Sequence, residues 1–254
     1  MADCNPTKFP MDPKELIHKD EEGVSVNPTD FKSVIGGLRY LVHTRPDIAY
    51  SVGIISRFME RPTVMHQNAA KKILRYIKGT LNLGLIYSKN NNNNMLTGYS
   101  DSDLAANVEE RKSTGGMTFY LNESLITWVY QKQRCVALSS CEAEFMAATA
   151  AACQAIWLKN LLVQITGEHI GLVVLYIDNK SAIDLAKNPV FHDHSKHIDI
   201  RYHFIRECVE KGEIIVKSVS TDKQKVDVLT KALTTVKFEK MRQLLGVRNV
   251  NKQV

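Results

Sequence analysis

The amino-acid sequence predicts an α/β fold in which a mixed five-stranded sheet is flanked by helices and preceded by a small helical segment. Residues before position 80 repeat their apolar side chains with a helical period. Residues after position 95 alternate between strand-like and helix-like patterns in the order β-β-β-α-β-α-α-β-α, which is typical of a mixed sheet with helices on its faces. A run of asparagines separates the two parts and predicts a linker between them.

The composition is that of an ordinary globular chain with a basic surplus. Of the 254 residues, 44% are hydrophobic and 24% are charged, and the formal net charge is +6. This charge is compatible with a polyanionic partner but does not require one. The five cysteines are scattered without a C-x-x-C pair, so we interpret them as reduced thiols. We interpret Trp128 and Trp157 as core residues.

The sequence carries no recognisable targeting signal. The first 20 residues are polar and contain three prolines, so they lack the apolar region of a secretory signal. No stretch is judged long and apolar enough to span a bilayer. We therefore expect a cytoplasmic or nuclear protein that is not secreted and has no membrane partner.

Helical patterns follow an extended or disordered lead that covers residues 1–28. The pattern becomes helical from Pro28-Thr29-Asp30. Gly36 and Gly37 predict a bend or a close contact with another helix. Two further helices follow, each after a proline, and we treat residues 29–89 as a helical unit. The apolar face of the first helix is predicted to comprise Val34, Leu38, Leu41 and Val42.

The asparagine run ends at Asn94 and marks the start of a second domain, which we assign to residues 95–234 and which precedes a C-terminal tail at 235–254. Its long helix begins with Ser139-Ser140-Cys141-Glu142, which fits a capping box. The apolar run Leu172–Ile177 is typical of a buried central strand. The other predicted elements are the strand Met95–Asp101, the hairpin Gly116–Leu121 and Leu125–Tyr130, the helices Ser139–Ile165, Asn179–Lys187, Lys196–Lys211 and Lys223–Leu233, and the strand Ile214–Val219.

Acidic residues follow two of the predicted strands at their carboxyl ends. Asp101 ends the first strand, and Asp178 follows the apolar strand. Because a right-handed crossover through the long helix would make these strands parallel neighbours, both aspartates would lie at one edge of the sheet. Glu144 shares a helix face with small alanines, which would let that helix approach the sheet closely. Asp227 begins the last predicted helix and would close the cluster from the other side.

Four carboxylates at one place require a compensating charge. Like charges at close range repel and are costly to bury, and divalent cations resolve that repulsion. Mg²⁺ prefers carboxylate and water oxygens, and two such ions about 3.5–4 Å apart can activate water and stabilise the leaving oxygen of a phosphodiester. The cluster therefore predicts a metal-dependent phosphoryl-transfer site. The alternative for each aspartate taken singly is a turn or cap residue.

Short motifs around these residues resemble a known family. Tyr99–Asp103, Arg111–Thr114, Ser139–Glu144, Asp178–Ala182, Lys196–His203 and Val226–Lys231 resemble the RNase H domain of copia-type retrotransposons. Upstream, Gly36–Leu41, Thr44–Ile48 and Leu74–Thr80 look like the segment that follows the polymerase palm in the same Pol polyproteins. The motifs occur in the family's order and cover nearly the whole chain.

The resemblance implies an RNase H-like fold and a metal-dependent endoribonuclease that hydrolyses the RNA strand of RNA–DNA hybrids. It also implies two Mg²⁺ ions as cofactor, with Mn²⁺ as a substitute. The family pattern selects Asp101 rather than Asp103, and Glu144 rather than Glu142. The catalytic residues and metal ligands that it assigns are Asp101, Glu144, Asp178 and Asp227.

The predicted substrate-binding residues are Arg111, Lys112, Ser140, Asn179, Lys196 and His197. Arg111 and Lys112 would contact phosphate, although a solvated turn is an equally good interpretation. By resemblance, Ser140 and Asn179 would touch the hybrid backbone or ribose hydroxyls, and both also suit helix caps.

Some features depart from the family pattern. Leu104 stands where the family usually has an aromatic residue, and Ala106-Asn107 stand where it has Gly-Asp. The polymerase palm is absent, so we expect no polymerase activity and regard the polymerase portion of a full-length polyprotein as a partner. The alternative function is a catalytically inactive nucleic-acid-binding remnant of the same polyprotein. An integrase or transposase is disfavoured, because its site would end in a late glutamate rather than follow the order Asp, Glu, Asp, Asp.

Overall fold

The protein forms two compact units in its computed structural model. The residues that the structure describes are 3–87, 94–104, 111–187 and 196–252. The first unit comprises Met1–Ile86 and Asp227–Val254, and the second comprises Tyr87–Val226.

The units divide the chain differently from the ranges expected from the sequence. Residues 227–254 group with the N-terminal helices, whereas residues 227–234 were expected in the second domain and residues 235–254 in a tail. The first unit ends just before the asparagine run, of which residues 90–93 lie outside the described residues.

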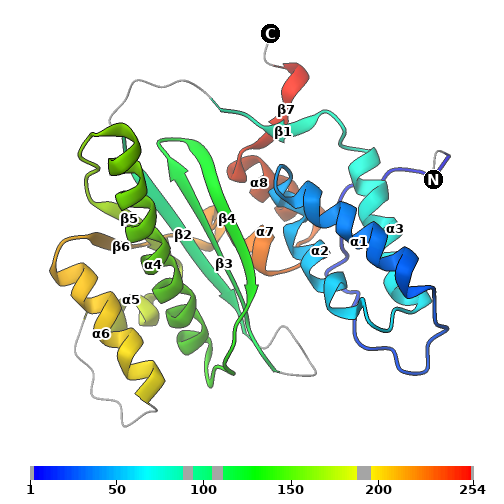
Figure 1. Cartoon of the computed structure of the whole chain (residues 1–254), viewed down its shortest axis with the longest axis horizontal. Helices are drawn as coiled ribbons and strands as arrows, with labels where there is room; N and C mark the ends of the chain where they lie inside the picture. Colours follow the sequence, from blue (N-terminus) through cyan, green and yellow to red (C-terminus); the bar gives the residue numbers. More distant parts are fainter. Residues whose placement is uncertain (1–2, 88–93, 105–110, 188–195, 253–254) are drawn as a thin grey trace. The chain divides into compact units, whose positions relative to one another are not determined.

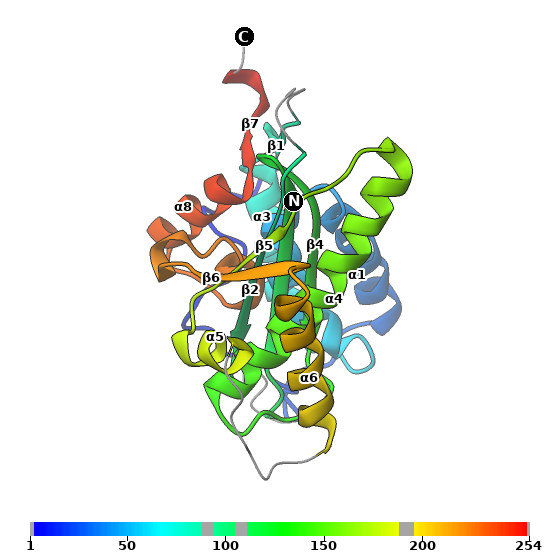
Figure 2. The same ribbon diagram turned by 90° about the vertical axis from the view of Figure 1, so that its left-hand side faces the viewer.

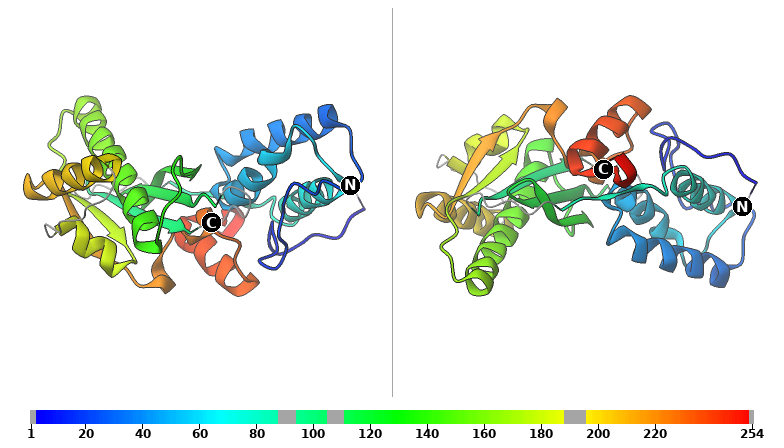
Figure 3. Two further views of the ribbon diagram at one scale, coloured as in Figure 1. Left: turned by 90° about the horizontal axis from the view of Figure 1, so that it is seen from below. Right: turned by 90° about the horizontal axis from the view of Figure 1, so that it is seen from above.

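The first unit is mainly helical. Figure 3 shows its helices α1 and α3 beside each other, and a short antiparallel pairing joins β1 to β7. The elements are α1 Pro28–Val42, the 3-10 turns Pro46–Ile48, Ser56–Phe58 and Val250–Lys252, α2 Ala49–Ile55, α3 Val64–Lys78, β1 Leu83–Leu85, α7 Asp227–Thr230, α8 Thr235–Leu245 and β7 Val247–Asn249.

Helix α1 begins where the sequence predicts but buries a different face. The Asn27 side chain accepts a hydrogen bond from the backbone N–H of Thr29, which caps the helix. The buried residues are Phe31, Ile35 and Leu38, so the predicted face was wrong apart from Leu38. The expected close contact at the two glycines is also wrong, because a Cβ atom on either would meet nothing within 4 Å.

Residues of the N-terminal lead lie along α3. The backbone N–H of Thr7 donates to the carbonyl of Arg75, and Arg75 Nε donates to the carbonyl of Asn5 at 2.6 Å. A single bridge pairs Ser25 with Thr63 just before α3. The described residues of the lead contain turns of their own, such as the bond from the Gly23 N–H to the Asp20 carbonyl, and they also contact α3 and the residues just before it.

A buried polar network joins distant segments of the first unit. Arg45 donates from Nε and Nη2 to the two carboxylate oxygens of Asp47, at 2.9 and 2.8 Å. Arg45 also donates to the carbonyl and hydroxyl oxygens of Thr80, at 3.1 and 2.9 Å. The Tyr76 hydroxyl donates to Asp47 at 2.5 Å and accepts from Arg242 at 3.1 Å. Two of the upstream motifs therefore bind each other, and the C-terminal helix α8 contributes to their contact.

Charge fixes the protonation states in this network. Burial, and then the Asp47 carboxylate, raise the pKa of Tyr76, so its hydroxyl stays protonated and donates. Burial opposes the charge on Arg45, but hydrogen bonding and Coulombic attraction by Asp47 outweigh it and raise the pKa of Arg45. Removing one member would leave a buried charge without its partner, which is the expensive outcome for such groups.

The second unit contains the five-stranded sheet. Its strand order is β4-β3-β2-β5-β6, with β2 antiparallel to β3 and parallel to β5 (Figure 1). The RNase H-like fold class with a mixed sheet and flanking helices is thereby confirmed. The strands are β2 Leu96–Asp103, β3 Thr114–Leu121, β4 Ser124–Lys132, β5 Val173–Ile177 and β6 Ile214–Ser218.

Three helices share an apolar core with the sheet. They are α4 Ser140–Thr166, α5 Lys180–Lys187 and α6 Lys196–Glu210, and Figure 2 shows α4 next to α6. Ala148, Ala151 and Ala155 are fully buried, as expected for a helix that approaches a sheet closely. On β2, Gly98 makes room for the Phe119 ring, because a Cβ there would lie 2.6 Å from it.

Other expectations for the second half were wrong. Trp157 is 56% exposed and is not a core residue, whereas Trp128 is half-buried. The helix expected at 223–233 is only the four-residue α7, preceded by a 3-10 turn at Thr221–Lys223. Pairing of Asp227 with two lysines and the packing of α7 on α2 and α8 hold this short helix in the first unit.

Helix α4 is long and apolar enough, by length and composition alone, to cross a membrane. The expectation that no stretch reaches that threshold was therefore wrong. The alanine face of α4 packs on the sheet, and a buried core helix has the same composition as a membrane span.

Replacing Tyr76 with phenylalanine removes the hydroxyl of the buried network and keeps the ring. We expect the free energy of unfolding to fall by about 1–3 kcal/mol, because Asp47 loses a buried donor and Arg242 loses an acceptor. Urea unfolding of the full chain measures the change. Tyr40→Phe is the matched control, since Tyr40 is 82% exposed. Equal unfolding midpoints for the two variants would contradict a stabilising role for the network.

Candidate metal centre

Three carboxylates of the second unit converge at the carboxyl edge of the sheet. Asp101, Glu144 and Asp178 each offer an oxygen atom, and these atoms lie within 4.8 Å of one another. Strand pairing explains the arrangement, because Tyr99 on β2 pairs with Tyr176 on β5 and each aspartate comes two residues later. The parallel pairing that the sequence predicted therefore brings the two aspartates level.

Helix α4 supplies the third carboxylate. Glu144 lies in the second turn, is 6% exposed, and accepts a hydrogen bond through Oε1 from the backbone N–H of Ser102 at 3.0 Å. Asp101 is also buried, and Asp178 is half-buried. One oxygen of the glutamate is thus held by the backbone of the residue that follows Asp101.

The donor set of this cluster fits a hard divalent cation. Three carboxylates at this separation repel one another, and burial strengthens the repulsion. Mg²⁺ takes carboxylate oxygens and keeps open positions for water or phosphate oxygens. The chemistry of the three residues therefore matches the cofactor that the sequence implies.

The negative charge of the cluster affects the pKa of a neighbouring cysteine, Cys141. Burial, and then the Glu144 and Glu142 carboxylates, raise the pKa of the Cys141 thiol. Cys141 is therefore a neutral thiol near neutral pH, and it is a poor nucleophile in that form.

Glu142 caps α4, unlike Glu144. The Ser139 hydroxyl accepts from the backbone N–H of Glu142 at 3.1 Å, as in a capping box. The Glu142 carboxylate accepts instead from the N–H of Leu138 at 2.7 Å, one residue before the cap. The expected capping box is half formed, and Glu142 has a structural partner of its own.

Asp227 lies in the first unit and is not one of the three grouped carboxylates. Its side chain is fully buried at the start of α7. Lys231 Nζ lies 2.9 Å from Oδ1, and Lys237 Nζ lies 2.5 Å from Oδ2. The role of Asp227 as a fourth metal ligand stays a prediction.

Four of the six predicted substrate-binding residues have described side chains, and their surroundings differ. Ser140 is exposed at the start of α4, and Arg111 is exposed with a positive φ of 52°. Lys112 is half-buried just before β3. Asn179 Oδ1 accepts from the backbone N–H of Ala182 at 3.1 Å, which caps α5.

Two predictions cannot be placed in the structure. The side chains of Lys196 and His197 lie outside the described residues, and so do Ala106 and Asn107.

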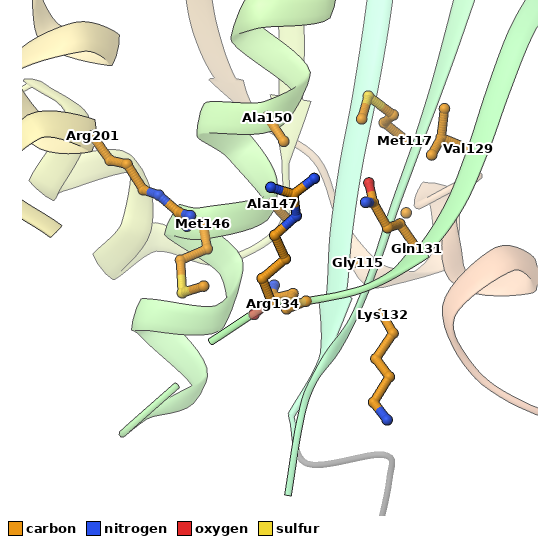
Figure 4. Close-up of a pocket in the computed structure, with 12 residues that line it drawn as sticks. Gly115, Met117, Val129, Gln131, Lys132, Arg134, Met146, Ala147, Ala150 and Arg201 are labelled. Atoms are coloured by element: carbon orange, nitrogen blue, oxygen red, sulfur yellow. The ribbon is translucent and has the colours of Figure 1, made fainter. Parts of the chain in front are cut away.

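A basic pocket that the sequence did not predict lies between β3, β4, α4 and α6. Its volume is about 310 Å³, and Figure 4 shows Arg134 and Arg201 reaching toward α4 beside Met146 and Ala147. Within the part of the chain that the structure describes, neither arginine forms a salt bridge. Arg201 belongs to a recognised motif, but only the packing of α6 reveals its direction.

Comparison with known proteins places the chain. No family model matches it. The Retrovirus-related Pol polyprotein from transposon TNT 1-94 of Nicotiana tabacum is 42% identical over 230 residues, which are 90% of this chain and 17% of that protein. The Secreted RxLR effector protein 161 of Plasmopara viticola is 44% identical over 129 residues, which are 50% of this chain and 90% of that protein.

One solved structure illustrates the likeness of fold. The N-terminal RNase H domain of rv2228c from Mycobacterium tuberculosis, fused to maltose binding protein, has 12% identity and a TM-score of 0.40. The match covers 59% of this chain and 96% of the RNase H domain. Because the TM-score is low, the fold class rests on the sheet topology alone.

The matched Pol polyproteins come from transposons of Nicotiana tabacum and Arabidopsis thaliana, and the chain spans 17% of the length of each. Between 90% and 98% of the chain takes part in these matches, at 38–42% identity. The chain therefore belongs to the retrovirus-related Pol polyproteins of copia-type transposons, as a segment of such a polyprotein.

Proposed function

We propose that the second unit is a metal-dependent endoribonuclease that hydrolyses the RNA strand of RNA–DNA hybrids. The observation that carries the proposal is the grouping of Asp101, Glu144 and Asp178 at the carboxyl edge of the sheet. Membership of the Pol polyproteins and the RNase H-like sheet topology agree with it.

The carboxylates would hold Mg²⁺, with Mn²⁺ as a substitute. When bound, two such ions would supply an activated water and would stabilise the leaving oxygen of the phosphodiester. The chain itself keeps its ligands oriented, because Glu144 is buried and bound to the N–H of Ser102. The Cys141 thiol beside the cluster stays protonated, so it is a poor nucleophile in competition with water. Asp227 would act as a fourth ligand only after exchanging its two lysine partners for metal.

A polyanionic substrate suits the charges around this site. Arg134 and Arg201 line a pocket on the same unit and would contact the nucleic-acid backbone. The polymerase portion of a full-length polyprotein would supply the hybrid as its product.

The competing function is a nucleic-acid-binding remnant that no longer cuts. The lysine pairs of Asp227 favour it, because they neutralise one predicted ligand. Cleavage and binding measured on the same hybrid separate the two functions.

Replacing Asp101 or Asp178 with asparagine should abolish cleavage of the RNA strand in a labelled hybrid. We expect a loss of at least about 100-fold, because each change removes an oxygen donor that stabilises charge in the transition state. Folding should be unaffected, since one of three repelling charges is removed. Cleavage by the parent chain should require Mg²⁺ or Mn²⁺, stop with EDTA and leave the DNA strand intact.

Two aspartates provide controls for this experiment. Asp184→Asn alters an exposed residue of α5, and Asp103→Asn alters the same strand as Asp101. Both should retain cleavage within about tenfold of the parent. Activity that survives in Asp178→Asn would refute the site. A folded parent that binds hybrid without cutting it would establish the remnant.

Replacing Arg134 and Arg201 together with glutamine should weaken hybrid binding at all sequences alike. If each arginine contacts one phosphate, the slope of log affinity against log salt should fall by about 1–2. Fluorescence anisotropy at several salt concentrations measures this slope. Lys217→Gln is the control, since Lys217 is exposed on β6 at the opposite edge of the sheet from β4. An unchanged slope in the double variant would show that the hybrid does not bind at Arg134 and Arg201.

A further inference from the structure

Gln133 lies where the end of β4 meets the carboxylate cluster. It directly follows β4, and its backbone N–H donates to the carbonyl of Ser113 at 2.8 Å. Ser113 directly precedes β3, so the backbone of Gln133 is held against the beginning of that strand. The backbone position of Gln133 is therefore set by the sheet.

The side-chain amide of Gln133 connects the neighbours of two candidate ligands. Its Nε2 donates to the carbonyl of Ala143 at 2.8 Å and to the hydroxyl of Ser102 at 3.2 Å. Ala143 precedes Glu144 in α4, and Ser102 follows Asp101 in β2. One amide group thus links the first turns of α4 to the end of β2.

The same contacts set the orientation of Glu144. Ser102, which receives a hydrogen bond from Gln133 on its hydroxyl, donates its backbone N–H to Glu144 Oε1 at 3.0 Å. Because a carbonyl can only accept, Ala143 also requires the nitrogen of the Gln133 amide to face it. Glutamine suits this place because its amide nitrogen carries two protons for two acceptors.

The surroundings of Gln133 fit it closely. On β3, a Cβ atom at Gly115 would lie 3.6 Å from Gln133 Nε2, an ordinary van der Waals distance, so the amide group lies directly beside this strand. Gln133 Oε1 is buried and has no hydrogen-bond partner among the described residues. The amide of Gln133 thus forms two hydrogen bonds through its nitrogen, while its oxygen is buried without a described partner. Because an unsatisfied buried oxygen is unfavourable, this arrangement indicates that the two bonds of the nitrogen are required.

We propose that Gln133 is a positioning residue that fixes Glu144 against Asp101 and so preorganises the metal centre. The proposal rests on the proposed function for its metal, but its structural part does not. Replacing a residue that orients a metal ligand typically lowers metal affinity or activity by about 10- to 100-fold.

The test compares Gln133→Met with Gln131→Met in the full chain. Methionine keeps the length of the side chain and removes both donors. Gln131 lies two residues earlier, is exposed at the end of β4, and no described hydrogen bond involves its side chain (Figure 4). In Gln133→Met, the Ser102 amide proton should exchange roughly tenfold faster in NMR, and Mn²⁺ affinity by calorimetry should fall by about tenfold or more. Gln131→Met should match the parent in both.

Each outcome has one meaning. Unchanged exchange at Ser102 in Gln133→Met would overturn the proposal, whatever the metal does. A parent that binds no Mn²⁺ would defeat the proposed function, and the exchange result would still judge the positioning role. If Gln133→Met does not fold, Ser102→Ala replaces it, because that change removes one acceptor of Gln133 and keeps the N–H at residue 102. It should give a smaller change in the same direction, and no change would overturn the proposal.

Discussion

The parallel pairing of β2 with β5 determines where the chemistry of the second unit lies. A parallel pair needs a crossover, and α4 provides it on the face of the sheet that holds the apolar core. The pairing aligns two aspartates at one edge, and the crossover helix starts at that same edge with its glutamate. The cost of three like charges at that edge is what makes a bound cation the simplest explanation of the cluster.

Much of the fold could be predicted because its signals are local. Period, proline positions and the apolar run before Asp178 gave the order of strands and helices in the second unit. The burial of α1 on Phe31 and Ile35 could not be predicted, since apolar residues lie on several sides of that helix. Tyr76 was missed for another reason, because its hydroxyl depends on partners far away in the sequence.

The candidate site divides in the same way. Asp101, Glu144 and Asp178 could be predicted, since strand ends and helix faces place them without reference to other side chains. Gln133 and Arg134 follow β4 in a stretch without periodicity, and only the folded sheet shows what they reach. The surroundings of Asp227 could not be predicted from its motif, because one of its two lysine partners, Lys237, lies outside the motif Val226–Lys231.

The first unit is assembled from both ends of the chain, and this has a consequence for synthesis. Strand β1 pairs with β7, so this pairing cannot form until residues 247–249 have been translated, long after the helices near the N-terminus. The second unit is continuous in sequence and has all its own residues earlier. On the ribosome, the sheet can therefore fold while the first unit is still an open pair of segments, and premature termination after residue 226 would spare the part that carries the grouped carboxylates.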